Sequence, residues 1–345
     1  MFLTVCLNPT LQKTLCFPSI TPDAVNRTAV HRLDASGKGI NVTRVLTQLG
    51  KKAVHLTQLG GVGIHAGLRP LFLSLCEQDG LSVEWVESGC ATGDCMTDGH
   101  TGQIRFCYTL LTGGNGGVTE LVEESAPVAA GTEERLLEKF DAMLGNPPCS
   151  VFPPPPVHCL IVSGTKAAGF SGAVIPSMVR KAKEKGLPVV LDIKGNDLTE
   201  SLKYEPDIVK PNLFEFAATF APNLIRDNDL MLDENRIEKQ IKTVLMETCL
   251  KYRCRIILTN GSRKIFAANG ADNDVENGGR YFKIEVPAVK AVNTTGCGDA
   301  FTAGLAAALF PEEKNKAATD FTAAISEGMR CGALNAGLEK PGVIR

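Results

Sequence analysis

Residues able to carry chemistry are concentrated in two glycine-rich segments of this 345-residue chain. The C-terminal segment reads Asn293-Thr-Thr-Gly-Cys-Gly-Asp-Ala-Phe-Thr-Ala-Gly304 and leads into the apolar run Phe301–Phe310, which predicts a buried helix. Its glycines let backbone N–H groups point inward, and N–H groups at a helix N-terminus bind phosphate oxygens. Asp299 would lie in the first turn of that helix. It either caps the helix or acts as the base that phosphoryl transfer needs beside an anion site.

The second segment, Ser36-Gly-Lys-Gly-Ile-Asn-Val-Thr-Arg44, also places glycines before a predicted helix. By itself this pattern is weak, because glycines commonly precede helices. The C-terminal segment is not a Walker A loop, since no Gly-Lys-Ser/Thr follows its glycines. The more specific signal is the combination of the two segments, about 250 residues apart in a chain of mixed strands and helices.

The elements that must position these segments alternate along the chain. Short apolar runs predict buried strands at Leu3–Leu7, Ala53–Leu56, Cys159–Ser163, Pro188–Asp192, Asp207–Val209, Arg255–Thr259 and Tyr281–Val286. Apolar residues at helical spacing predict helices at Ile40–Leu49, Ala66–Asp79, Ser171–Lys185 and Asn235–Tyr252. This alternation indicates an α/β fold with a mainly parallel sheet. Residues 10–35 and 84–125 break the pattern and predict a small second sheet, which leaves a core over 1–9, 36–83 and 126–345.

The composition is that of an ordinary globular protein, with 44% hydrophobic and 21% charged residues. A net charge of −2 argues against nucleic-acid binding, and no run of 18 apolar residues predicts a membrane span. The 12 cysteines form no C-x-x-C pair, which favours buried thiols of a cytoplasmic protein over zinc ligands. The proline-rich stretch 145–157 predicts an exposed connector, the alternative being a ligand for a proline-recognition domain.

Taken together, the two segments resemble the motifs of the PfkB/ribokinase family of sugar kinases. Three further stretches, Thr4–Pro9, Val25–Thr28 and Lys210–Leu213, resemble the branch of that family that phosphorylates sugar phosphates. The resemblance covers nearly the whole chain. It implies a ribokinase-like three-layer α/β/α core with a small β-sheet lid formed by residues 10–35 and 84–125. It also implies ATP and Mg²⁺ as cofactors.

The resemblance assigns the roles in phosphoryl transfer. Asp299 matches the family's catalytic base, which takes the proton of the attacking hydroxyl. The anion hole of the family matches Thr295, Gly296, Cys297 and Gly298.

Further positions match the family's nucleotide and metal sites. Asn212 and Glu215 match the pair that orders the Mg²⁺ of Mg-ATP, often through water. The alternative for Glu215 is an acid in the first turn of a helix. Thr259 and Gly261 match a strand end that contacts the nucleotide, and Asn335 falls at the wall of the adenine pocket.

The same resemblance implies a sugar-phosphate site. Its sugar-binding positions match Gly37, Lys38, Gly39, Asn41 and Ser163. Arg27 and Arg105 would hold the phosphate already on the substrate, because a planar guanidinium can grip phosphate at two places. The alternative for both arginines is a solvated surface charge.

Three positions depart from the family pattern. Gln12 replaces an aspartate that accepts hydrogen bonds from sugar hydroxyls, so the substrate-binding contact there changes from a carboxylate to a neutral amide. Ser36 replaces the usual first glycine of the N-terminal motif. Ser262 follows Gly261 where a second glycine is usual. Asp299 and the anion hole are kept, which argues against an inactive kinase.

The resulting hypothesis is an ATP-dependent kinase that phosphorylates a hydroxyl of a ketohexose phosphate: fructose 1-phosphate, tagatose 6-phosphate or fructose 6-phosphate. One alternative is a kinase of a free sugar or a nucleoside. Another is a non-catalytic protein that binds nucleotide or sugar phosphate on the same scaffold, since fold alone does not fix function. An exposed lid sheet would allow pairing with a second copy into a homodimer.

Overall fold

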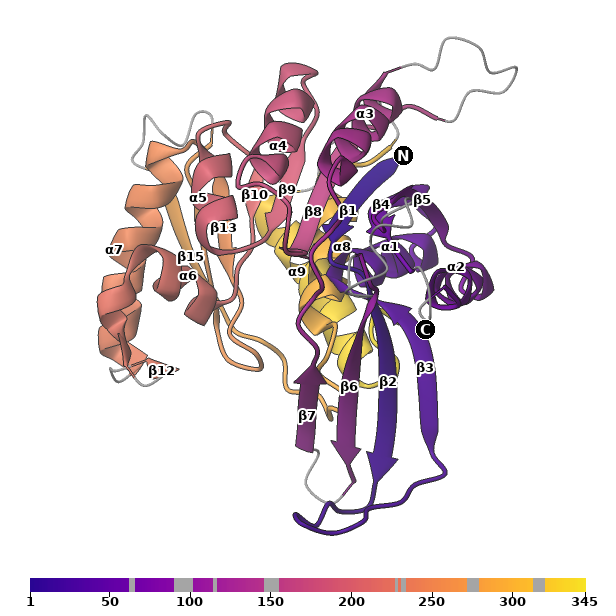
Figure 1. The fold of residues 1–345 in the computed structure, drawn as a ribbon. Helices are drawn as coiled ribbons and strands as arrows, with labels where there is room; N and C mark the ends of the chain where they lie inside the picture. The colour runs from indigo at the N-terminus through magenta and orange to yellow at the C-terminus, as the bar shows by residue number, and fades with distance from the viewer. Residues whose placement is uncertain are drawn as a thin grey trace. The chain divides into compact units, whose positions relative to one another are not determined.

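The computed structural model describes residues 1–61, 66–89, 102–113, 117–145, 155–226, 229–230, 234–271, 279–312 and 320–345. Most of the proline-rich stretch lies outside these residues. The fold is α/β, with a large, mainly parallel sheet and a separate four-stranded sheet, as predicted (Figure 1). The chain forms two compact units. The first holds residues 1–156, 163–171 and 289–345, and the second holds residues 157–162 and 172–288.

The first unit contains part of the large sheet, in the strand order β8-β1-β4-β5. These strands are β1 (Phe2–Leu7), β4 (Ala53–Leu59), β5 (Ser82–Glu87) and β8 (Cys159–Lys166), whose first residues belong to the second unit. The pairs β1–β4 and β4–β5 are parallel. Every residue of β1 is buried, as expected for a strand covered on both faces.

Five helices accompany these strands among the described residues of the first unit. They are α1 (Lys38–Gln48), α2 (Leu68–Gln78), α3 (Thr132–Leu144), α8 (Cys297–Leu309) and α9 (Phe321–Ala336). Helix α1 packs against β1, β4 and α8, and α8 packs against α9. The two glycine-rich segments, far apart in sequence, therefore open two helices that lie against each other.

The small sheet also belongs to the first unit and has the order β3-β2-β6-β7. Its strands are β2 (Thr10–Phe17), β3 (His31–Ser36), β6 (Arg105–Thr112) and β7 (Gly117–Val122). The pairs β2–β3 and β6–β7 are antiparallel, whereas β2–β6 is parallel. One face carries Leu11 and Ala35 into an apolar cluster with Ile40 and Phe72. The alternating residues of β2, Thr10, Gln12 and Thr14, are buried and polar.

The second unit continues the large sheet in the order β15-β14-β13-β10-β9-β8. Its strands are β9 (Val189–Asp192), β10 (Ile208–Val209), β13 (Arg255–Leu258), β14 (Ile265–Asn269) and β15 (Arg280–Ile284), with a separate short pair β11 (Ile225–Arg226) and β12 (Asp229–Leu230). Its helices are α4 (Val174–Glu184), α5 (Gly195–Leu202), α6 (Leu213–Phe220), α7 (Glu234–Lys251) and the 3₁₀ turn Pro222–Leu224. Strands β9, β10 and β13 are parallel, and β14 and β15 are antiparallel additions.

The predicted strands and helices are found within a few residues of their expected bounds. Strand β5 places residues 84–87 in the large sheet, so the second contribution to the small sheet begins at β6. The domain boundaries drawn from the sequence stay a prediction. Each helix in the described part of the chain is too short or too polar to span a bilayer. The nine cysteines in that part are free thiols, most of them buried.

Candidate active site

The start of α8 is the position of the predicted anion site. Gly296 is the N-cap residue, with φ of 82° in the left-handed region that favours glycine, and no side chain of the described residues caps the helix. A Cβ atom at Gly296 would lie 3.0 Å from the backbone N of Gly342. The N–H of Cys297 donates to the carbonyl of Thr294 at 3.3 Å. The start of a helix leaves N–H groups without intrahelical acceptors, so this turn is suited to phosphate oxygens.

Asp299 lies in this first turn and is almost completely buried, with 4% of its surface exposed. Its Oδ2 accepts a hydrogen bond of 2.8 Å from Nδ2 of Asn41, on α1. The bond joins the two glycine-rich segments across 258 positions of sequence. The structure therefore brings two of the predicted site residues into direct contact. A buried carboxylate held by a neutral donor is a suitable group to accept a proton.

The side chain of Cys297 is not suited to a charged role. Burial raises the pKa of its thiol to about 11, and the neighbouring Asp299 adds to the effect. The thiol is therefore neutral at physiological pH. Any contribution of Cys297 to the anion site comes from its backbone.

The start of α1 favours glycine at two positions for different reasons, backbone conformation at Gly37 and close packing at Gly39. Gly37 has φ of 111°, which other residues rarely adopt. At Gly39 a Cβ atom would lie 2.5 Å from Cε1 of His55 and 2.7 Å from the Cβ of Cys6. Burial lowers the pKa of His55 to about 3, so this imidazole is neutral. Its Nδ1 lies 2.8 Å from the hydroxyl of Thr4.

Ser163 lies in the second half of β8, which ends at Lys166, and the residue after it approaches the start of α1. It is fully buried, and Gly164 after it has φ of 106°. A Cβ atom at Gly164 would lie 3.0 Å from Sγ of Cys6 and 3.4 Å from the Cβ of Lys38. Ligands of α/β sheets bind at the carboxyl ends of strands, so the predicted sugar site would lie at the carboxyl-terminal half of β8 and stays a prediction.

Gln12 is held by two hydroxyl groups on the buried polar face of the small sheet. Its Nε2 donates to Oγ1 of Thr109 at 2.5 Å, and its Oε1 accepts from Oγ of Ser36 at 2.7 Å. All three side chains are at most 3% exposed. The two departures from the family pattern in this region, Gln12 and Ser36, are thus hydrogen-bond partners of each other.

The two arginines predicted to hold phosphate differ in their surroundings. Arg105 donates from Nε to Oγ1 of Thr10 at 3.1 Å and from Nη1 to the carbonyl of Glu123 at 3.4 Å. Arg27 is exposed in the loop between β2 and β3. Only Arg105 is therefore held in one place by contacts with the small sheet.

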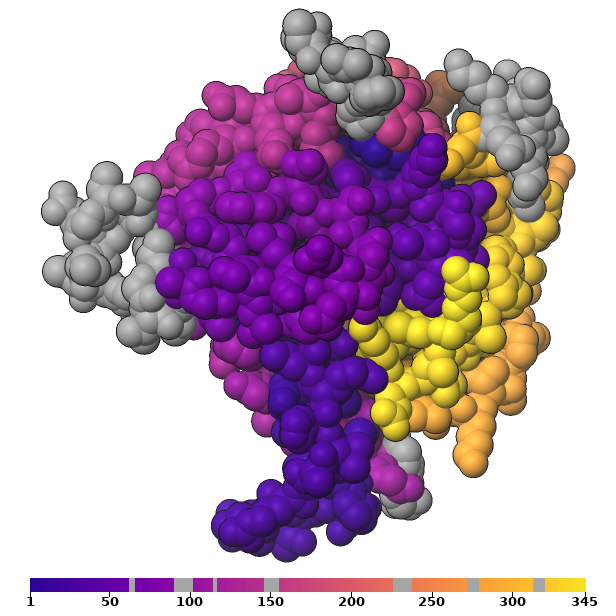
Figure 2. Space-filling model, turned by 90° about the vertical axis from the view of Figure 1, so that its right-hand side faces the viewer, coloured from indigo at the N-terminus to yellow at the C-terminus, as the bar shows by residue number. Residues whose placement is uncertain are grey.

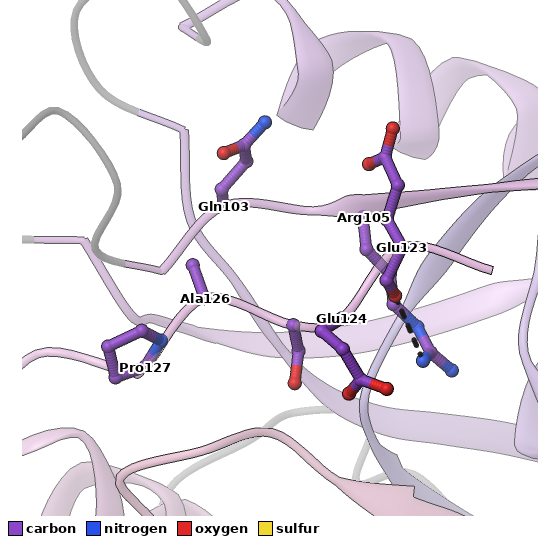
Figure 3. Close-up of a pocket in the computed structure, with 7 residues that line it drawn as sticks. Gln103, Arg105, Glu123, Glu124, Ala126 and Pro127 are labelled. Atoms are coloured by element: carbon purple, nitrogen blue, oxygen red, sulfur yellow. Dashed lines mark hydrogen bonds between the residues drawn. The ribbon is translucent and has the colours of Figure 1, made fainter.

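A surface pocket of about 250 Å³ lies beside Arg105 (Figure 3). It is lined by Gln103, Arg105, Glu123, Glu124, Ser125, Ala126 and Pro127. Its two glutamates outnumber the single arginine, which makes the pocket itself unsuited to a phosphate group. We therefore place the candidate site at the start of α8 and not in this pocket.

Two further residues bear on the anion turn. Thr295 donates from Oγ1 to Oε1 of Glu120, on β7 of the small sheet, at 3.2 Å. Asn335, on α9, is fully buried, and its Oδ1 has no hydrogen-bond partner among the described residues. That oxygen would lie 3.1 Å from a Cβ atom at Gly296, so Asn335 borders the turn itself. Its position at the wall of the adenine pocket stays a prediction.

In the second unit, Asn212 and Glu215 form a reciprocal cap on α6. The backbone N–H of Glu215 donates to Oδ1 of Asn212 at 2.7 Å, and the backbone N–H of Asn212 donates to Oε2 of Glu215 at 3.1 Å. Nζ of Lys194 lies 3.7 Å from Oε1 of Glu215. The side-chain oxygens of Asn212 and Glu215 already have partners within the protein. The pair is therefore better suited to contact a metal ion through water than to bind it directly.

Thr259 lies next to this cap, in an isolated parallel bridge with Asn212. The N–H of Leu213 donates to the carbonyl of Thr259 at 2.8 Å. Gly261 follows with φ of 58° and open space where a Cβ would be. The structure thus brings Asn212, Glu215 and Thr259 together within the second unit.

Sequence reasoning missed several polar residues near these predicted positions. Arg44 contacts Asn41, Glu120 contacts Thr295, and Lys210 forms a buried ion pair of 3.4 Å with Asp192. Arg44 belongs to the segment Ser36–Arg44 and Lys210 to the stretch Lys210–Leu213. A charged residue next to an apolar run in these motifs could have indicated a buried polar contact. Glu120 has no such signal, because its partner is 175 positions away.

Comparison with solved structures finds proteins of the same fold. Phosphofructokinase-2 from Escherichia coli, solved with potassium, is 18% identical with a TM-score of 0.73, over 98% of this chain and 93% of that one. The same enzyme solved with fructose-6-phosphate is 17% identical with a TM-score of 0.73, over 97% and 93%. A protein described as a possible 1-phosphofructokinase from Thermotoga maritima is 17% identical with a TM-score of 0.72, over 98% and 92%.

These structures establish the shared fold. The family is established by a sequence profile, that of the pfkB family carbohydrate kinases, which matches residues 160–340, slightly more than half of the chain. The family expected from the two glycine-rich segments is thereby confirmed. The chain belongs to the pfkB family of carbohydrate kinases, which are phosphotransferases acting on a sugar hydroxyl.

Proposed function

We propose that this kinase uses ATP to phosphorylate a hydroxyl group of a ketohexose phosphate, such as fructose 1-phosphate, fructose 6-phosphate or tagatose 6-phosphate. The observation that carries the proposal is the buried carboxylate of Asp299, held by Asn41 at the uncapped start of α8. A base and an anion site are the two parts that phosphoryl transfer requires of a protein.

Asp299 takes the proton of the attacking hydroxyl as that oxygen bonds to the transferred phosphoryl group. The N–H groups around Gly296, Cys297 and Gly298, with Thr295 beside them, stabilise the charge that develops on the phosphoryl oxygens. These donors are fixed by the backbone conformation, so they need no reorganisation during the reaction. Water is excluded when the small sheet covers the bound sugar, which predicts low ATP hydrolysis without sugar.

The substrate binds among the residues close to Asp299 in the first unit. Support comes from the close approach of Lys38 to Gly164 on β8, since a Cβ atom at Gly164 would lie 3.4 Å from the Cβ of Lys38. Arg105 holds the substrate's phosphate, and Arg27 joins it from the exposed loop. Gln12 borders the sugar as a neutral amide, since both of its polar atoms are already bonded within the small sheet.

ATP carries Mg²⁺, which neutralises the nucleotide oxygens when it is bound. Asn212 and Glu215 order water around the metal from the capped start of α6. Support for this indirect role is the capping geometry, in which Oδ1 of Asn212 and Oε2 of Glu215 each accept a backbone hydrogen bond. Thr259 and Gly261 contact the nucleotide, and Asn335 forms part of the wall of the adenine pocket.

A second copy of the chain pairs with the small sheet. Strand β7 is an edge strand, and its residues Leu121 and Val122 are 54% and 50% exposed. Exposed apolar residues on an unpaired edge favour association. Light scattering should show a dimer, and Leu121→Lys should convert it to a monomer. A monomeric wild-type protein would refute this pairing.

The substrate proposal is tested by ADP release with Mg-ATP and a panel of acceptors: the three ketohexose phosphates, free hexoses, ribose and adenosine. We expect turnover with one sugar phosphate and a rise in its KM in Arg105→Ala. Turnover only with a free sugar or nucleoside would replace the proposed substrate class. Binding of ATP and sugar phosphate without ADP release would instead support a non-catalytic binding protein.

A further inference from the structure

We infer that Arg44 is a positioning residue for Asp299, acting through the side-chain amide of Asn41. The inference rests on the proposed function, because it concerns the base of that reaction. Arg44 lies on α1, three residues after Asn41 and therefore on the same side of the helix. It is buried, with 3% of its surface exposed.

The amide of Asn41 is bonded at both ends. Nη1 of Arg44 donates to Oδ1 of Asn41 at 2.9 Å, and Nδ2 of Asn41 donates to Oδ2 of Asp299 at 2.8 Å. A guanidinium has donors only, so it can contact the amide oxygen but not the amide nitrogen. Arg44 therefore fixes which way the amide points. The NH₂ group is turned to the carboxylate, and a flipped amide would place two acceptors together.

The guanidinium of Arg44 is itself fixed on its other sides. Nε donates to Oδ2 of Asp79 at 2.9 Å, Nη2 donates to the carbonyl of Ala35 at 2.7 Å, and Nη1 also donates to the carbonyl of Pro341 at 3.1 Å. These contacts come from the end of α2, from β3 and from the C-terminal segment. A planar fork satisfies several acceptors at once, which the single ammonium of lysine cannot do.

A second cation strengthens this anchor. Nζ of Lys340 lies 2.5 Å from Oδ1 of Asp79 and 3.1 Å from Oδ1 of Asp34. Burial alone would raise the pKa of Asp79, but Arg44 and Lys340 together lower it, so the carboxylate stays charged. Figure 2 shows the C-terminal residues, in yellow, bordering the indigo and purple surface of the N-terminal part. The C-terminal segment thus helps to hold Arg44 in place.

The first test is a double-mutant cycle on turnover with the accepted sugar phosphate. We expect Arg44→Lys to lower kcat ~10–100-fold with the KM for ATP unchanged, since a misplacement near 1 Å can cost about 100-fold. In an Asn41→Ala background the same change should lower kcat by less than about 2-fold, because its route to Asp299 is already lost. Additive losses, or a kcat of Arg44→Lys within about 2-fold of wild type, would overturn the inference.

Gln48→Ala is the matched control on the same helix. It removes the bonds of the Gln48 side chain to Gly342, to Ile344 and to the backbone carbonyl of Arg44, but it leaves the guanidinium of Arg44 and the amide of Asn41 in place. It should lower the thermal midpoint and leave kcat within about 2-fold. If Arg44→Lys does not fold, Asp79→Asn weakens the same anchor, and it should lower kcat while keeping the KM for ATP.

The second test does not depend on the substrate. The NMR signals of the Asn41 side-chain amide, assigned by their loss in Asn41→Ala, should exchange slowly with solvent in the wild type. They should exchange quickly in Arg44→Lys and remain slow in Gln48→Ala. Signals unchanged in Arg44→Lys would refute the inference. A wild type inactive on every acceptor would refute the proposed function, while this measurement would still decide the role of Arg44.

Discussion

Helices α8 and α6 begin with the same sequence feature, an acidic residue in the first turn, and use it in opposite ways. On α6 the acid, Glu215, bonds back to its own helix start and shares a reciprocal cap with Asn212. On α8 no side chain of the described residues caps the helix, and Asp299 is held instead by Asn41 from another helix. The first arrangement caps its own helix, whereas the second leaves the start of α8 without a side-chain cap and ties its carboxylate to α1.

The difference follows from the residue at the N-cap. Asparagine supplies an acceptor for the helix N–H groups, so α6 begins with its donors satisfied. Glycine has no side chain to supply one, so α8 begins without a side-chain cap, and position 296 has a left-handed φ of 82° that favours glycine. A first-turn acid is therefore informative about function only when read together with its N-cap residue.

The largest effect is expected from Asp299→Asn, which tests whether the first-turn acid of α8 acts as a base. The amide has the same size as the carboxylate but cannot take a proton, so we expect kcat to fall about 1,000-fold, within the usual range for a general base. ATP binding by calorimetry should stay within about 2-fold, because the backbone donors remain. Near-normal turnover would remove Asp299 from the role of base.

Gly296→Ala tests the turn itself. The left-handed φ costs a residue with a Cβ about 1–2 kcal/mol, and the misplaced N–H groups should lower kcat about 100-fold. Gly50→Ala is a matched control, since Gly50 has φ of 74° but nothing within 4 Å of its Cβ position. Gly50→Ala should lower the free energy of unfolding in urea by a similar amount, and its kcat should be that of the wild type. Equal kcat values in the two variants would contradict the special role of the α8 turn.

A third helix start, that of α1, depends on a neutral histidine packed against Gly39. Burial lowers the pKa of His55 from 6.5 to about 3, so the unfolded chain binds a proton that the folded protein does not. Its stability contribution is complete above pH 6.5 and is lost as the pH falls from there toward 3, by about 2 kcal/mol at pH 5. The free energy of unfolding, measured with urea at pH 7.5 and at pH 5, should differ less between the two pH values in His55→Gln than in the wild type. An unchanged difference would exclude His55 as the cause.

The smallest effects should come from the α6 cap, where two variants separate capping from metal binding. Asn212→Ala removes the cap and should cost about 1 kcal/mol of stability. Glu215→Gln can keep the reciprocal cap but loses the charge, so its stability should change by less than about 0.5 kcal/mol. Its KM for Mg-ATP should rise several-fold if Glu215 orders the metal. An unchanged KM would assign the pair to capping alone.

Local patterns predicted most of this fold, because strands and helices follow from the spacing of apolar residues. The same holds for the glycines before α1 and α8, whose φ angles need no distant partner. The contacts that organise the site could not be predicted this way. Asp299 and Asn41, or Gln12 and Thr109, meet only through the folded topology, and one sequence carries no record of such pairs. For Glu215, the spacing to Asn212 allowed both a cap and a metal role, and the cap is what the structure contains.

The bond between Ser36 and Gln12 has an evolutionary consequence. A chain with Gln12 but glycine at position 36 would lack the hydroxyl that donates to the buried amide oxygen, whereas Ser36 beside the aspartate of the family pattern would still find a carboxylate oxygen as its acceptor. The benefit of Gln12 therefore depends on Ser36, which is epistasis in one direction. Ancestral reconstruction should find Ser36 no later than Gln12. Ser36→Gly should be less stable than the wild-type protein in urea unfolding.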